Sequence, residues 1–105
     1  MTKAAAAQKT RAVSSIMRSE EEFFDRIWYD RKLGYLQNIE DGRESPPPRD
    51  IEKGMNAAML RVEKKYGGEQ ALRGYYSSDF EWGMMCGKLS ALRWVLGDEW
   101  DNLDT

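Results

Sequence analysis

Few side chains in this sequence could perform catalytic chemistry. The 105 residues contain no histidine, which removes the commonest general base and the commonest metal ligand. A Ser–His–Asp or Cys–His nucleophilic site is therefore excluded within the chain. The single cysteine, Cys86, falls inside an expected helix, where we interpret it as a small buried apolar residue. One cysteine excludes an internal disulfide and fits a reducing compartment.

Carboxylates are the remaining candidates for catalysis. Glu21, Glu22 and Asp25 fall within about one helical turn of each other, and residues 98–101 hold a second acidic group. Magnesium and calcium sites need several oxygen ligands that converge in a fixed geometry. Both groups lie at expected helix ends, where acidic residues ordinarily compensate a helix dipole or aid solubility. We therefore expect no metal, no cofactor and no enzymatic activity.

Basic residues gather in two places, which leaves nucleic-acid binding as an alternative function. The first 18 residues hold four bases and no acid, and three more bases fall near the end of an expected helix. The side chains that could contact phosphates are Lys3, Lys9, Arg11, Arg18, Arg61, Lys64 and Lys65. The whole chain, however, carries a net charge of -2, whereas a protein that coats nucleic acid is normally strongly basic.

Hydrophobic periodicity predicts an all-α fold that would position these side chains. Ser19 and Glu22 spell a capping box, and the apolar residues that follow recur at helical spacing, so we expect a helix over 20–40. Three consecutive prolines then interrupt the chain, and Asp50 is expected to cap a second helix over 51–66. No segment alternates apolar and polar residues over a useful length, so no strand is expected.

A third main helix is expected over 79–96. Ser78 and Glu81 spell a second capping box, and Gly97 follows the last apolar residue. Residues 69–73 could form one further turn. We therefore expect a small bundle of three to four helices. Its parts are a basic arm or short helix over 1–18, a helical domain over 19–97 and an acidic tail over 98–105.

The expected helix over 79–96 is apolar on two faces, which is the most informative pattern in the sequence. On a projection of 100° per residue, one face carries bulky apolar residues and the opposite face mixes small and bulky ones. The mixed face consists of Phe80, Gly83, Met84, Gly87, Ala91, Trp94 and Val95. Charged residues, Arg93 among them, fall only at the seams between the two faces. Such a helix is central in a bundle or shared between chains.

Three occupants could cover the mixed face: the leading segment or Trp100 of the same chain, a second copy, or a different protein. On the 20–40 helix, Tyr29, Leu33 and Leu36 form a smaller apolar patch that we also expect to be an interface. Twelve aromatic residues and six methionines exceed what a three-helix core needs, and protein interfaces favour these residue types.

These observations predict a small, non-enzymatic protein–protein interaction module. It would act as a homo-oligomer or as a small subunit of a larger assembly, with the nucleic-acid accessory role as the alternative. The chain starts without a long apolar signal stretch, and no apolar run is long enough to cross a bilayer. We therefore expect a cytoplasmic protein without a membrane partner.

Overall fold

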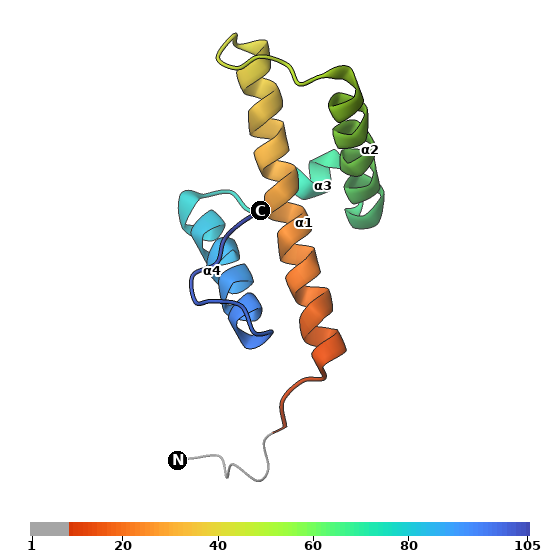
Figure 1. The fold of residues 1–105 in the computed structure, drawn as a ribbon. Coiled ribbons are helices and arrows are strands. Elements are labelled where there is room, and N and C mark those ends of the chain that lie inside the picture. Colours follow the sequence, from red (N-terminus) through yellow and green to blue (C-terminus); the bar gives the residue numbers. More distant parts are fainter. Residues whose placement is uncertain (1–8) are drawn as a thin grey trace.

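Residues 9–105, which the computed structural model describes, fold into four α-helices (Figure 1). The helices are α1 (Val13–Glu40), α2 (Arg49–Tyr66), α3 (Glu69–Arg73) and α4 (Asp79–Val95). No strand occurs within residues 9–105, and the expected all-α class is confirmed. The further turn predicted over 69–73 is the short helix α3.

α1 begins at Val13 rather than at residue 20, so the predicted start is wrong. The carbonyl of Ala12 accepts hydrogen bonds from the N–H groups of Ser15 and Ile16, at 3.0 and 3.2 Å. Ser19 and Glu22 therefore lie inside the helix, where backbone N–H groups already have partners and a capping box has no role. The expected boundary between residues 18 and 19 falls within one continuous helix.

The boundaries of α2 follow proline and glycine closely. α2 begins at Arg49, directly after the N-cap residue Pro48. The expectation that Asp50 caps α2 is wrong, because Asp50 lies in the first turn of the helix. Its negative charge there is favourable at the positive end of the helix dipole. α2 ends at Tyr66 with Gly67 as its C-cap, as predicted, because the φ of 93° at Gly67 is a left-handed conformation that glycine adopts without strain.

α1 is the central helix, and the other helices lie on two of its flanks (Figure 1). α2 and α3 pack against α1 on one flank, and α4 packs against it on the other. Within the described part of the chain, α2 and α4 make no contact with each other. The bundle is therefore open, and its buried side chains form two separate hydrophobic cores.

The first core lies between α1, α2 and α3. Its buried residues are Tyr29, Met59, Val62 and Leu72. Tyr29 is 1% exposed, and Leu33 and Leu36 are partly buried against this core. The expectation that Tyr29, Leu33 and Leu36 form an intermolecular patch is therefore wrong, because α2 and α3 of the same chain occupy that side of α1. Periodicity shows that a helix face is apolar, but it does not show which segment covers the face.

The second core lies between α1 and α4. Ile27, Met85 and Leu89 are buried there. Partly buried aromatic residues surround them: Phe23, Phe24, Tyr76 and Trp82. Since the two cores are separate and each contains only three or four buried apolar side chains, each flank of α1 depends on a small number of contacts.

Candidate interaction surface on α4

α4 begins with Ser78 as its N-cap, as the sequence predicts, but the return contact of Glu81 goes to Ser77 and not to Ser78. The Ser78 hydroxyl accepts a hydrogen bond from the Glu81 N–H at 3.1 Å. The Glu81 carboxylate accepts from the N–H and the hydroxyl of Ser77, at 2.7 and 2.9 Å. These two hydrogen bonds lower the pKa of Glu81. Together the contacts fix the direction in which the chain enters α4.

The C-terminal end of α4 is fixed by backbone hydrogen bonds. α4 ends at Val95, with Leu96 as its C-cap, and Gly97 follows with a φ of 106°. The N–H groups of Gly97 and Asp98 donate to carbonyls of the last helical turn, at 3.0 and 2.9 Å. A glycine in this conformation is a common way to end a helix, so the predicted stop at Gly97 holds.

The inner side of α4 is anchored to α1 and fixes the rotation of α4 about its own axis. Met85 and Leu89 point into the second core against Ile27. Cys86 is partly buried beside them, and burial raises the pKa of its thiol, opposed by the nearby charge of Arg31. With these side chains held inward, the opposite side of α4 faces away from α1.

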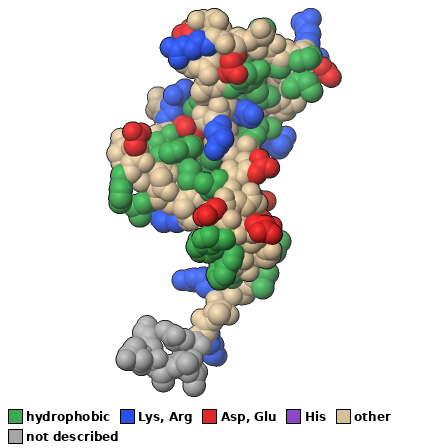
Figure 2. Space-filling view, turned by 60° about the vertical axis from the view of Figure 1, so that its left-hand side comes forward, with side chains coloured by type: hydrophobic (Ala, Val, Ile, Leu, Met, Phe, Trp, Pro, Cys, Tyr) green, Lys and Arg blue, Asp and Glu red, His purple; other side chains and the backbone are tan. Residues whose placement is uncertain are grey.

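That opposite side is exposed along the whole helix. We call it the α4 outer face, and its residues are Phe80, Gly83, Met84, Gly87, Ala91, Trp94 and Val95. Phe80 is 75% exposed, Trp94 53% and Met84 47%, which are large fractions for bulky apolar side chains. Figure 2 shows hydrophobic side chains that reach the surface on this flank of the molecule. A run of exposed apolar residues on one helix face is typical of an interaction site.

The two glycines of the α4 outer face are open to approach. A Cβ atom added at Gly83 or Gly87 would meet no atom within 4 Å outside the local helix backbone. Among the described residues, no segment of the same chain covers these positions. A neighbouring helix could therefore come closer here than at positions with longer side chains.

The C-terminal tail reaches only one end of this face. The Trp100 ring meets the Trp94 ring edge to face, with centroids 4.8 Å apart. Both rings nevertheless stay more than half exposed. Trp100 therefore extends the apolar surface beyond Trp94 and leaves Gly83 and Gly87 uncovered. Of the leading segment over 1–18, residues 9–18 lead into and begin α1 and leave Gly83 and Gly87 uncovered, whereas residues 1–8 lie outside the described residues.

A buried arginine holds the tail against the second core. Arg93 is the charged residue with the lowest exposure in the described chain, and its Nε lies 3.4 Å from the Glu20 carboxylate. Its guanidinium also donates to the carbonyl of Asn102 at 3.4 Å and lies over the Phe24 ring. Sequence projection placed Arg93 only at a seam, and its partner Glu20 is too distant in sequence for that projection to find.

The basic residues considered for nucleic-acid binding lie at two places. Lys3 lies outside the described residues. Lys9 and Arg11 are exposed ahead of α1, and Arg18 is exposed near its start. The others, Arg61, Lys64 and Lys65, are exposed on the last turns of α2.

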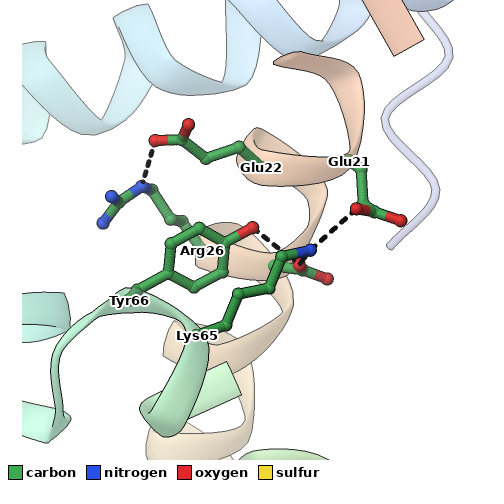
Figure 3. A network of polar contacts seen from close by, with 6 residues as sticks. Glu21, Glu22, Arg26, Lys65 and Tyr66 are labelled. Carbon is green, nitrogen blue, oxygen red and sulfur yellow. Dashed lines mark hydrogen bonds and ion pairs between the residues drawn. The ribbon is translucent and has the colours of Figure 1, made fainter. Parts of the chain in front are cut away.

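An ion-pair network joins the end of α2 to α1 (Figure 3). The Lys65 ammonium lies 2.7 Å from the Glu21 carboxylate and 3.3 Å from that of Asp25. The Tyr66 hydroxyl donates to Asp25 at 2.8 Å. Burial, together with this carboxylate, raises the pKa of Tyr66 to about 12. Glu21 and Asp25 were candidate ligands of a metal ion, but in the structure they bind Lys65. Their negative charges also reduce the positive charge that this end of α2 could present to phosphate.

No helix in the part of the chain described here is both long and apolar enough to span a membrane. Among residues 9–105, no three acidic or cysteine side chains converge as a metal site would require. Comparison of the chain with protein-family models, with curated proteins and with solved structures found no match.

Proposed function

We propose that this chain is a protein–protein interaction module that binds its partner through the α4 outer face. It acts as a homo-oligomer or as a small subunit of a larger assembly, in the cytoplasm and without enzymatic activity of its own. One observation carries the proposal. Phe80 and Trp94 are exposed on either side of the open positions Gly83 and Gly87, on a helix whose other side is anchored in a core.

The energetics of the α4 outer face favour binding. Complete burial of a large apolar side chain contributes about 1.5–3 kcal/mol, and Phe80 and Trp94 each have most of that contribution still to gain. Tryptophan, here Trp94, is also among the residue types that most often dominate the binding energy of an interface. α4 is already held by its caps and by the second core, so little conformational entropy is lost when a partner binds.

The groups that could do chemistry have structural partners, which favours binding over catalysis. Glu21 and Asp25 hold Lys65. The Cys86 thiol has a raised pKa, whereas a reactive cysteine has a lowered one. The nucleic-acid alternative is weakened at the end of α2, because Lys65 there faces two carboxylates.

Site-specific photo-crosslinking in cells tests this proposal whatever the partner is. A photoreactive residue at Met84, on the α4 outer face, is expected to give one or a few discrete adducts. The matched control is Asn56, an exposed position on α2 away from this face. If Met84 and Asn56 give the same weak and unspecific adducts, the proposed function is wrong.

A further inference from the structure

We infer that the partner of the α4 outer face is a second copy of this chain, with the two α4 helices antiparallel about a two-fold axis at Gly87. This inference rests on the proposed function and names the partner that the function requires. It is drawn from the order of side-chain sizes along α4, from the exposed apolar area and from the order of charges.

The sizes of the side chains on the α4 outer face are symmetric about Gly87. Phe80 and Trp94 lie seven residues before and after Gly87, and Gly83 and Ala91 lie four residues before and after it. Seven residues are almost two helical turns, so Phe80, Gly87 and Trp94 form one line along the face. The face is therefore narrow at its middle and bulky at equal distances from it.

A two-fold axis at Gly87 makes this arrangement self-complementary. In an antiparallel pair, a residue a given number of positions before Gly87 faces the residue the same number after it in the other copy. Gly83 then faces the partner's Ala91, and the two Gly87 backbones meet at the closest point. Phe80 packs against the partner's Trp94 at both ends of the contact. Small residues in the middle permit close backbone approach, and the aromatic pairs fill the wider space at the ends.

The exposed apolar area is sufficient for a dimer. Phe80 is 75% exposed and Trp94 53%, and Trp100 adds a ring that is 61% exposed. Met84 and Val95 on the same face are 47% and 55% exposed. At about 200 Å² for each of these five side chains, the face and Trp100 together offer roughly 600 Å² per copy. Two copies would bury about 1,200 Å², which is the lower end of the range for specific, stable protein interfaces.

The order of charges on α4 favours the antiparallel orientation. Asp79 and Glu81 lie in the first turn, whereas the exposed Lys88 lies just beyond Gly87 in the second half. An antiparallel pair keeps the acidic first turns of the two helices at opposite ends of the contact and opposes the two helix dipoles. A parallel pair would place the acidic first turns side by side, where they repel.

Light scattering of the purified full-length chain tests whether it dimerises. At about 100 µM we expect twice the chain mass of 12.2 kDa. Gly87→Leu is expected to weaken the dimer at least about 100-fold, because its side chain would occupy the point of closest approach. The variant should still fold, since a Cβ atom at this exposed position meets no neighbouring atom in the single chain and leucine is a better helix former than glycine. Gly54→Leu on α2 is the matched control, because Gly54 is also an exposed helical glycine with open space around it.

Disulfide trapping tests the orientation. In a Cys86→Ser background, Gly83→Cys and Ala91→Cys chains are mixed and oxidised. An antiparallel pair forms the mixed disulfide between the two variants and neither homodimer, since equal positions lie about 12 Å apart along the helices. Homodimeric disulfides without the mixed product would overturn the antiparallel arrangement. A monomer at about 100 µM would overturn the inference as a whole, while a discrete Met84 crosslink to a different protein would leave the proposed function standing.

Discussion

The guanidinium carbon of Arg26 lies 3.7 Å from the centre of the Tyr75 ring and 4.8 Å from the centre of the Tyr66 ring. Tyr66 ends α2, and Tyr75 belongs to the connection between α3 and α4. Arg26 also donates from Nε to the Glu22 carboxylate at 2.9 Å (Figure 3). A single side chain of α1 therefore holds both the end of α2 and the chain that leads into α4.

Arg26→Lys is expected to lower the free energy of unfolding by about 1 kcal/mol. Lysine keeps the positive charge but lacks the planar group that stacks on both tyrosine rings. The matched control is Arg73→Lys, because Arg73 forms an exposed ion pair with Glu69 one turn away, and such pairs contribute less than about 0.5 kcal/mol. Urea unfolding followed by circular dichroism measures both, and equal losses would contradict the stacking role of Arg26.

Ser78→Ala is expected to destabilise the protein by about 1 kcal/mol, because it removes the hydroxyl that accepts from the Glu81 N–H at the start of α4. Ser19→Ala changes an identical sequence spelling inside α1 and is expected to be neutral or slightly stabilising, since alanine is the better helix former. The difference between the two urea midpoints measures the cap. Equal destabilisation would mean that Ser19 also caps a helix.

Stability is expected to fall as the pH rises from about 10 to about 12. Burial raises the pKa of Tyr66 to about 12, and burial with nearby carboxylates raises the pKa values of Tyr29 and Tyr76. A tyrosine that is harder to ionise when folded contributes stability below its unfolded pKa, near 10, and that stability is lost as the pH rises toward the folded pKa. The Glu21 carboxylate raises the pKa of Lys65, which acts in the same direction.

The urea midpoint measured at several alkaline pH values tests this dependence. Tyr66→Phe should give a shallower fall over the same range, because one of the contributing hydroxyls is gone. A midpoint that stays constant to pH 12, or a slope that Tyr66→Phe leaves unchanged, would contradict the assignment.

Leu89→Ala is expected to loosen α4 more than α2. Leu89 is fully buried in the second core, and such truncations cost about 2–5 kcal/mol. Amide hydrogen exchange in α4 should become at least about thirtyfold faster, with a smaller change in α2. Met59→Ala, in the first core, should give the reverse pattern. Equal acceleration of both helices by both variants would show that the two cores unfold as one unit.

Features that depend on neighbouring residues could be predicted from the sequence. Gly67 and Gly97 end their helices because a left-handed residue is needed locally, and Ser78 caps α4 through an N–H only three residues away. The periodicity of α4 likewise indicated which side chains point together. In each case the physical cause lies within a few residues of the position it determines.

Features that depend on distant segments could not be predicted. Ser19 and Ser78 both match the sequence pattern of an N-cap, but Ser19 lies inside α1, which already begins at Val13. The apolar patch of Tyr29, Leu33 and Leu36 was correctly found from helical periodicity, but α2 and α3 of the same chain cover it. Arg93 is buried because it meets Glu20, which lies 73 residues earlier in the chain. The start of α1, the segment that covers Tyr29 and the burial of Arg93 all depend on how distant segments pack on one another.

The placement of α2 and α4 on separate flanks of α1 determines how a binding event on one would affect the other. Because these two helices do not touch each other within the described chain, energetic communication between them passes through α1 and the connection at Tyr75. A partner that binds α4 would therefore stabilise the packing of α2 against α1 only to the extent that it makes α1 more rigid around Arg26.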